Sequence, residues 1–432
     1  MIRKNTAEFL RTCSEDTFNI HFPILDLDSV GGRLNPSQLD WPKSLKNRLL
    51  NSTSLDGQLF GQSTRGFISL NEYLKLDDGP SLGRWEYGVV ATDKSVELAE
   101  RINELYHGQG AVTVSSGMAA INATVGTVHH YLRDVHDKIF AEDCAILVPQ
   151  HVYYPFTRLI GNRTYFSPEQ VIHYGPTEEN FEAVVAKAIS NKKLIGMIYI
   201  ESPVSNYFDA HDLGLLTKRA NELGALTVID NTFSTYLGCQ PIKNYGVDII
   251  IDAGTKYLGG YADCPYGAVI CKDPSMAERV SSFVRAHGLG TMAPGLAVLA
   301  IHRLESADER MRASYETARK LREEVFAPML DRGVVSEVRV YDPSAIGSPR
   351  LAEQYRRGNG LFTAVFNTAK ERNAFVNNTP LLIAGASWGG HVTLATEPTI
   401  HGKPGARFYA GLEAPEDLKR AFERGRKLTF GF

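Results

Sequence analysis

The sequence predicts an α/β protein built on a mostly parallel β-sheet, with a smaller region at the C-terminal end. Six short apolar runs are typical of buried strands, and amphipathic stretches with helical spacing separate several of them. Continuous apolar strands that alternate with helices indicate a parallel sheet covered on both faces. The length of 432 residues exceeds one ordinary core, so we expect two packed domains or one large α/β domain with an appendage.

The expected elements follow in chain order. Residues 1–85 are rich in Asn, Ser, Gly and Asp without a regular pattern, and we expect an N-terminal arm there. Residues 86–295 are the expected large α/β domain, with strands at 110–114, 144–148, 194–200, 225–229, 247–251 and 266–270 and helices at 95–105, 117–128 and 212–223. Residues 296–432 are the expected C-terminal α+β domain, with helices at 306–324 and 415–425 and strands at 361–366 and 390–395.

Composition and charge argue against several classes of function. The apolar fraction of 43% and charged fraction of 22% are typical of a soluble globular protein, and the net charge of −3 offers no basic field for nucleic acid or a membrane. The charged start at residues 1–4 is not followed by the apolar segment of a signal peptide, and no run approaches membrane-spanning length. The cysteines are scattered without metal-ligand spacing, so we expect reduced thiols, no metal site and a cytoplasmic protein; they are Cys13, Cys144, Cys239, Cys264 and Cys271.

Two strand ends carry the groups that an enzyme dependent on pyridoxal 5′-phosphate (PLP) needs. Lys256 follows the apolar run 247–251, where a buried ammonium is costly unless it is used. One use is a Schiff base with a carbonyl such as the aldehyde of PLP. Asp230 ends another apolar run 26 positions upstream and would suit the pyridine nitrogen. Two ordinary strand ends with surface charges would show the same spacing, so both interpretations stay open on spacing alone.

Two further strand ends have features of a ligand site. The small residues 115–120 open a helix after the strand 110–114, and free N–H groups at a helix start suit a phosphate. Small residues also let a helix pack closely on a strand, so this signal is weak alone. No Walker A loop and no GxGxxG after a strand occurs, which argues against nucleotide binding. Tyr153 follows the strand 144–148 and would stack on a flat ring or fill part of the core.

Together these pieces resemble the Cys/Met-metabolism PLP-dependent enzymes, the γ-family of fold type I, which includes cystathionine β-lyase, cystathionine γ-synthase, cystathionine γ-lyase and methionine γ-lyase. The matching motifs are Ser-Gly-Met-Ala-Ala (116–120), Tyr153 before Pro155, Glu-Ser-Pro (201–203), Asp-Asn-Thr (230–232), Thr-Lys-Tyr-Leu-Gly-Gly (255–260), Ser-Trp-Gly-Gly (387–390) and the segment 407–413. The resemblance runs from about Ser95 to the C-terminus. It implies a mostly parallel seven-stranded-type sheet sandwiched by helices, with a smaller α+β C-terminal domain.

The resemblance implies a role for each matching residue. Lys256 carries PLP and moves protons, Asp230 pairs with the pyridine nitrogen and keeps it protonated, and Tyr153 stacks on the ring as a second catalytic residue. The implied cofactor contacts also include Gly117, Met118, Thr232 and Thr255, of which Gly117, Met118 and Thr255 hold the phosphate. The implied substrate contacts are Arg407, which grips the α-carboxylate, and Ser387 and Trp388. A surface arginine and a core tryptophan are the alternatives for Arg407 and Trp388.

One motif departs from the family. Relatives carry Tyr-x-Arg before the helix that begins near Ser95, where it completes the phosphate site of the neighbouring subunit. Alignment through Thr92 and Glu97 places Trp85 and Tyr87 at those two positions, so the arginine is missing or displaced. Arg84 and Arg65 are the candidate substitutes. The resemblance still implies a homo-oligomer, a dimer or tetramer, with active sites at the subunit interface.

The implied reaction is elimination on a sulfur-containing or otherwise β- or γ-substituted L-amino acid. The Ser-Trp-Gly-Gly form is most like bacterial cystathionine β-lyases, which favours C–S bond cleavage at Cβ. The altered Tyr-x-Arg position suggests a specialised substrate, and γ-elimination or γ-replacement on a homoserine-derived amino acid stays open. A non-catalytic regulator or scaffold with the same fold is the alternative of another class. The intact Lys256, Asp230 and Arg407 argue against that alternative.

Overall fold

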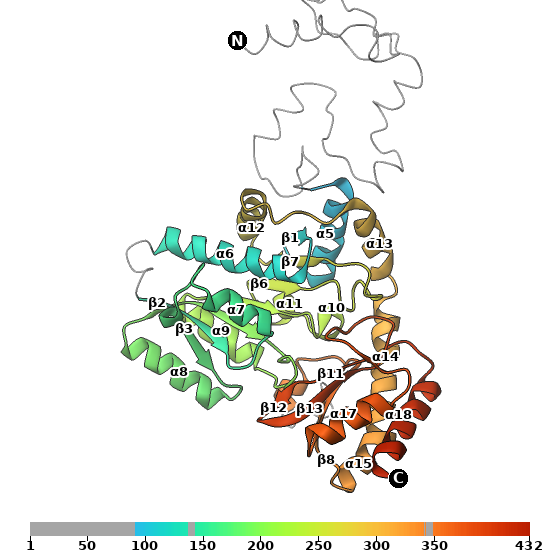
Figure 1. Cartoon of the computed structure of the whole chain (residues 1–432). Helices are drawn as coiled ribbons and strands as arrows, with labels where there is room; N and C mark the ends of the chain where they lie inside the picture. The colour runs from blue at the N-terminus through green and yellow to red at the C-terminus, as the bar shows by residue number, and fades with distance from the viewer. Residues whose placement is uncertain (1–90, 137–142, 341, 343–348) are drawn as a thin grey trace, which may run out of the picture. The chain divides into compact units, whose positions relative to one another are not determined.

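Two β-sheets organise the fold, one near the middle of the chain and one toward its C-terminal end (Figure 1). The computed structural model describes residues 91–136, 143–340, 342 and 349–432, and all of these fall within one compact unit. The expected N-terminal arm at 1–85 lies outside the described residues, as do Arg65, Arg84, Trp85 and Tyr87.

The first sheet has seven strands in the order β1-β7-β6-β5-β4-β2-β3. The pairs β2–β3, β2–β4, β4–β5 and β5–β6 are parallel, whereas β7 runs antiparallel to both of its neighbours. The carboxyl ends of β2, β4, β5 and β6 therefore meet at one edge. The strand bounds are β1 (Gly110–Val114), β2 (Cys144–Pro149), β3 (Val171–Tyr174), β4 (Leu194–Glu201), β5 (Leu226–Asp230), β6 (Ile249–Asp252) and β7 (Gly267–Cys271).

Helices cover both faces of this sheet because alternate strand residues point to opposite sides. Ile250 joins the apolar cluster that contains residues of α5, α8, α9 and α13, whereas its neighbours Ile249 and Ile251 join the cluster with residues of α6, α7 and α12. The helix bounds are α5 (Asp93–Tyr106), α6 (Gly117–Val135), α7 (Tyr154–Gly161), α8 (Glu178–Ser190), α9 (Leu213–Leu223), α10 (Thr235–Gly238), α11 (Pro241–Tyr245), α12 (Pro274–Ala286) and α13 (Pro294–Leu304), with a 3₁₀ turn at Pro168–Gln170.

The second sheet follows the order β10-β11-β13-β9-β8, with β12 paired to β13, and its elements are orange to red in Figure 1. A phenylalanine-rich cluster joins it to α14, α17 and α18. The bounds are α14 (Ala307–Leu321), α15 (Ala327–Asp331), β8 (Val335–Val340), α16 (Pro349–Ala352), β9 (Leu361–Phe366), α17 (Ala369–Asn378), β10 (Ile383–Ala384), β11 (Leu394–Thr396), β12 (Thr399–Ile400), β13 (Lys403–Tyr409) and α18 (Pro415–Phe430), with a π-helical turn at Arg322–Phe326.

The α/β class and the seven-stranded sheet are confirmed, while some element bounds differ from the prediction. The strand expected at 390–395 begins only at Leu394, because the chain bends from Gly389, where φ is 81°, through residue 392. The last helix continues past residue 425 to Phe430. The expected domain boundary at 295/296 falls inside α13, and the domain division stays a prediction. No helix in the described part of the chain is long and apolar enough to cross a membrane.

Candidate active site

The candidate site lies at the edge where the parallel strands of the first sheet end. Glu201 ends β4, Asp230 ends β5 and Asp252 ends β6, and the turn that follows β6 carries Lys256. Open sheets of this kind bind ligands beyond the carboxyl ends of their strands. The loop between β10 and β11, which belongs to the second sheet, brings Ser387 and Trp388 to the same place.

The Lys256 amine points toward the second sheet. Its Nζ donates a hydrogen bond to Ser387 Oγ at 2.8 Å and lies 5.3 Å from the centroid of the Trp388 ring. Burial, helped by the nearby Arg407 and opposed by Asp230, lowers the pKa of Lys256 to about 8. A lysine with this pKa supplies the neutral amine that attacks a carbonyl near physiological pH.

Gly389 allows the two sheets to meet at this lysine. A Cβ on Gly389 would lie 2.7 Å from the carbonyl carbon of Lys256, and its φ of 81° is unfavourable for other residues. The Ser-Trp-Gly-Gly segment therefore packs directly on the backbone of Lys256. This close approach places Ser387 within reach of the amine.

Asp230 and Glu201 form a buried pair of carboxyl groups. They stand directly opposite each other in the β4–β5 register and are only 8% and 5% exposed. Burial raises the pKa of both groups, and the charge of Asp230 adds to the shift of Glu201. Like charges directly opposite each other destabilise a sheet unless a cation offsets them. A protonated pyridine nitrogen against Asp230 is such a cation, so this carboxyl pair fits PLP.

Thr232 fixes the Asp230 carboxylate relative to the lysine turn. Its backbone N–H donates to Asp230 Oδ1 at 3.1 Å, and its hydroxyl accepts from the backbone N–H of Ala253 at 2.8 Å. Ala253 lies three residues before Lys256. The predicted cofactor residue Thr232 thus joins the two strand ends that the sequence singled out.

The start of α6 forms the predicted phosphate cradle. Ser116 caps the helix, and its side chain accepts from the backbone N–H of Ala119 at 3.1 Å. A Cβ on Gly117 would lie 2.5 Å from the Cβ of Ala253, so only glycine fits between the helix start and the lysine turn. Met118, the second residue of α6, is partly buried. The free N–H groups here suit a phosphate, which is the second feature that fits PLP.

The Thr255 hydroxyl, which was expected to bind the phosphate, is hydrogen-bonded to the backbone of Tyr266. The hydroxyl donates to the backbone carbonyl of Tyr266 at 3.1 Å and accepts from the N–H of Tyr266 at 3.0 Å. A contact with a phosphate would need this O–H to turn from the Tyr266 carbonyl to a phosphate oxygen, so that contact stays a prediction.

Tyr153 lies at the mouth of β2, just before α7, with 41% of its surface exposed. Its backbone N–H donates to Glu201 Oε2 at 2.6 Å. Burial raises the pKa of the phenol, and the carboxylates of Asp230 and Glu201 add to the shift. The Tyr153 ring therefore lies close to Asp230, the carboxylate expected to pair with the pyridine nitrogen.

Arg407 lies on β13 and is only 7% exposed. Its Nη1 donates to Asn206 Oδ1 at 3.0 Å and its Nη2 to the carbonyl of Ala386 at 3.3 Å. Burial lowers the pKa of this guanidinium to about 10. Among the described residues no carboxylate forms an ion pair with it. A buried guanidinium without a counter-ion is a ready partner for a ligand carboxylate.

Trp388 serves the core as well as the site. It is 8% exposed, and its ring centroid lies 5.0 Å from that of Phe233 and 5.3 Å from that of Tyr257. The sequence-predicted residues are thus gathered around one strand edge. Sequence reasoning gave no role to Glu201, although the Glu-Ser-Pro motif directly after an apolar run marked its position, and it missed Asn206 altogether.

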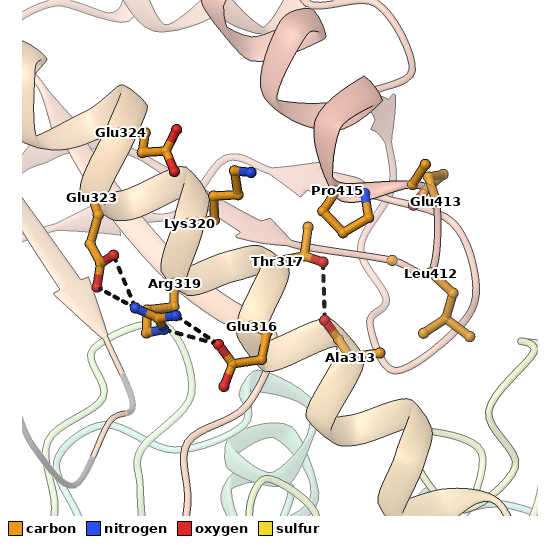
Figure 2. Close-up of a pocket in the computed structure, with 12 residues that line it drawn as sticks. Ala313, Glu316, Thr317, Arg319, Lys320, Glu323, Glu324, Leu412, Glu413 and Pro415 are labelled. Atoms are coloured by element: carbon orange, nitrogen blue, oxygen red, sulfur yellow. Dashed lines mark hydrogen bonds and ion pairs between the residues drawn. The ribbon is translucent and has the colours of Figure 1, made fainter.

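A separate pocket of about 540 Å³ lies between α14 and the segment before α18 (Figure 2). Figure 2 shows Arg319 held between Glu316 and Glu323, at 2.9 and 3.1 Å. None of the predicted site residues lines this pocket, and its arginine already has its counter-charges. We therefore assign no role in the reaction to it.

Comparison with solved structures identifies the fold of the protein. The fold matches cystathionine γ-synthase from Xanthomonas oryzae pv. oryzae, solved in complex with aminoacrylate and cysteine, with a TM-score of 0.71 over 86% of this chain and 92% of that one at 22% identity. The protein therefore has the fold of the fold type I PLP-dependent enzymes.

The chain belongs to the family described as Cys/Met metabolism PLP-dependent enzyme, whose sequence model matches residues 67–422, and its cofactor is PLP. The match begins before Ser95, where the resemblance was expected to start. Cystathionine γ-lyase of Bacillus subtilis is 27% identical over 80% of this chain and 86% of its own length. Cystathionine β-lyase MetC of Staphylococcus haemolyticus is 29% identical over 77% of this chain and 75% of its own length.

Proposed function

We propose that this enzyme catalyses elimination on a sulfur-containing or otherwise β- or γ-substituted L-amino acid, in the form of C–S bond cleavage at Cβ. The observation that carries the proposal is the buried Arg407, which has no acidic partner among the described residues. It stands at the same site as the Lys256 amine, as its effect on the pKa of that amine indicates. The site thus offers one group for a substrate carboxylate and one for a proton.

The residues that would hold PLP are Lys256, Asp230, Tyr153, Thr232, Thr255, Gly117 and Met118. When bound, PLP withdraws electrons from the substrate and makes its Cα proton acidic. Asp230 would face the pyridine nitrogen, Tyr153 would stack on the ring, and the start of α6 would hold the phosphate.

The protein groups then divide the remaining work. Arg407 would hold the α-carboxylate in a two-pronged contact, which fixes the orientation of the Cα–H bond. Lys256 Nζ would take the Cα proton, since a base with a pKa of about 8 is well matched to neutral pH. Ser387 Oγ accepts a hydrogen bond from Lys256 Nζ and would keep it in position. The Cβ–S bond would then break as a Cα–Cβ double bond forms, and the departing thiolate would take up the proton that Lys256 had removed from Cα.

Elimination at Cγ is the second candidate, because it uses the same residues with one more proton transfer at Cβ. The Ser-Trp-Gly-Gly motif at Ser387–Gly390, which is most like that of bacterial cystathionine β-lyases, favours elimination at Cβ. The relatives do not separate the two, since a γ-lyase and a β-lyase match with similar identity. Replacement at Cγ is represented by the γ-synthase among the solved structures. A scaffold role would not need the complete set of Lys256, Asp230 and Arg407.

A substrate panel tests the proposal. Purified enzyme is given cystathionine, cysteine, methionine, O-acetylhomoserine and O-succinylhomoserine, and keto acid, ammonia and thiol are measured. We expect pyruvate from a β-thioether amino acid as the strongest signal, with none from a Lys256→Ala control. 2-Oxobutyrate as the main product would establish γ-elimination, and a new thioether would establish replacement. Wild-type enzyme that carries PLP yet releases no product from any compound would refute the β-lyase assignment.

We further propose a cytoplasmic homo-oligomer with active sites at the subunit interface. The family resemblance supports this assembly, and closed symmetric assemblies are common among soluble enzymes. Sedimentation analysis of the active enzyme should show a dimer or tetramer. An active monomer would contradict the proposal.

A further inference from the structure

Glu201 connects the loops that follow two neighbouring strands, β2 and β4. It is the last residue of β4 and is 5% exposed. Its Oε2 accepts the backbone N–H of Tyr153 at 2.6 Å, and its Oε1 accepts the backbone N–H of Ser205 at 2.7 Å. Each carboxylate oxygen therefore fixes a different loop at the carboxyl edge of the sheet.

The two loops carry different functional groups. The first presents the Tyr153 ring, which is predicted to stack on the cofactor. The second continues from Ser205 to Asn206, whose Oδ1 accepts a hydrogen bond from Arg407 Nη1 at 3.0 Å. Glu201 thus joins the cofactor side of the site to the arginine predicted to bind the substrate.

The second loop also binds the second sheet. The carbonyl of Asn206 accepts from the hydroxyl of Thr363 on β9 at 3.2 Å, and the carbonyl of Tyr207 accepts from Arg339 on β8 at 2.9 Å. Because this loop is held at both ends, a shift at Glu201 would pass to Arg407.

The chemistry of this link requires a carboxylate. Both loops offer N–H donors, so both side-chain oxygens must accept, whereas a glutamine would turn an NH₂ group toward one of them. The carboxylate is nevertheless costly here: burial and the charge of Asp230, directly opposite in the register of β4 and β5, raise the pKa of Glu201 to about 8, while the two N–H donors oppose this rise and favour the charged form. A group that served only to fill space would not need this charge.

We propose that Glu201 is a positioning residue that fixes Tyr153 relative to the Asn206–Arg407 pair. The position of the ring that stacks on the cofactor and the position of the arginine that binds the substrate carboxylate then depend on the same side chain. The inference rests on the proposed function, because it assigns Arg407 to the substrate and Tyr153 to PLP.

The test uses Glu201→Gln and measures binding rather than turnover. The first readout is the Kd of PLP for the apoprotein, from quenching of intrinsic fluorescence. The second is the Kd of glycine, an amino acid without a leaving group, from the change that it causes in the visible spectrum of the PLP-loaded protein. We expect glycine to bind roughly tenfold more weakly and PLP several-fold more weakly, because one charge-assisted hydrogen bond is lost.

A matched control lies at the opposite edge of the same sheet. Asp248 Oδ2 accepts the backbone N–H and the hydroxyl of Thr227 at 2.9 and 2.8 Å, and its Oδ1 pairs with Lys272 at 2.8 Å. Asp248→Asn keeps one oxygen for Thr227 and loses the ion pair, so it removes one charged contact of a buried-edge carboxylate away from the site. This variant should melt at a lower temperature with both Kd values unchanged. If Asp248→Asn shifted the glycine Kd as much as Glu201→Gln does, Glu201 would only stabilise the fold and would not position the site.

Asn206→Gly decides the question if Glu201→Gln does not fold. It removes only the side chain that holds Arg407, and glycine readily adopts the φ of 67° found here. Glycine should bind several-fold more weakly while the Kd of PLP stays that of the wild type. This inference, but not the proposed function, would be overturned if Asn206→Gly bound glycine with the wild-type Kd. It would also be overturned if Glu201→Gln bound both glycine and PLP with the wild-type Kd values. Wild-type protein that does not take PLP on Lys256 would overturn the proposed function instead.

Discussion

The proton equilibrium of Lys256 gives a prediction that needs neither substrate nor cofactor. Burial is the largest cause of its lowered pKa, Arg407 adds to the lowering, and Asp230 opposes it. Arg407→Gln should therefore raise the pKa of Lys256 while leaving it below the ordinary value of 10.5, because the burial remains. Asp230→Asn should lower the pKa further.

The magnitude follows from the value of about 8. At pH 7 about a tenth of the Lys256 amines are neutral, and each unit by which the pKa rises lowers this neutral fraction about tenfold. In wild-type apoprotein the neutral fraction should therefore increase about tenfold from pH 7 to pH 9 and then level off. A lysine with the ordinary value would show a rise of about a hundredfold over the same interval without a plateau.

Competitive labelling with acetic anhydride measures this fraction directly. Apoprotein is labelled between about pH 6 and 11, and mass spectrometry follows the peptide that contains Lys256, with the other lysine peptides as internal reference. The labelling midpoint should lie near the predicted pKa and move in opposite directions in the two variants. A midpoint that does not move in Arg407→Gln, or that moves downward, would refute the placement of the arginine beside the amine.

Three further predictions concern the same groups. Asp230→Asn should retain PLP but lose most activity in the keto-acid assay, because an amide does not favour a protonated pyridine nitrogen; near wild-type turnover would contradict the assigned role. Arg407→Lys should lower kcat/KM roughly 10- to 100-fold with an unchanged PLP absorption spectrum, through the loss of a charged hydrogen bond, and loss of PLP would instead make Arg407 a structural residue. Because the pKa of Lys256 is lower in the folded than in the unfolded state, its charged form destabilises the apoprotein below about pH 8, and this loss is recovered as the pH rises toward 10.5. Lys256→Met apoprotein should accordingly be more stable than wild type at pH 7 by up to roughly 3 kcal/mol, and this difference should shrink above pH 8. Chemical denaturation at several pH values measures the difference. A stability difference that does not shrink with rising pH, or that has the opposite sign, would contradict the prediction.

The sequence was most informative where strands are buried on both faces. The run that became β2 is apolar throughout, and β6 consists of three isoleucines before Asp252, because helices cover both sides of the sheet. It failed at β3, a four-residue edge strand that includes an exposed histidine, and at β13, which opens with Lys-Pro-Gly. Neither of these strands has the apolar pattern that marks a buried one.

The contacts of the site depend on tertiary structure. Lys256 and Asp230 were visible from the sequence because each follows an apolar run. The bond from Lys256 to Ser387 spans 131 positions, and that from Arg407 to Asn206 spans 201. No local pattern predicts such pairs. The role of Glu201 was hidden for the same reason, because both of its partners are backbone N–H groups, which leave no trace in the residue types.

The most direct test of the account is the position of the cofactor. Borohydride reduction of the purified protein followed by peptide mapping should place the pyridoxyl mass on the peptide that contains Lys256. A label on another lysine, or no label in protein purified with added PLP, would contradict the assignment of Lys256 and with it the proposed function.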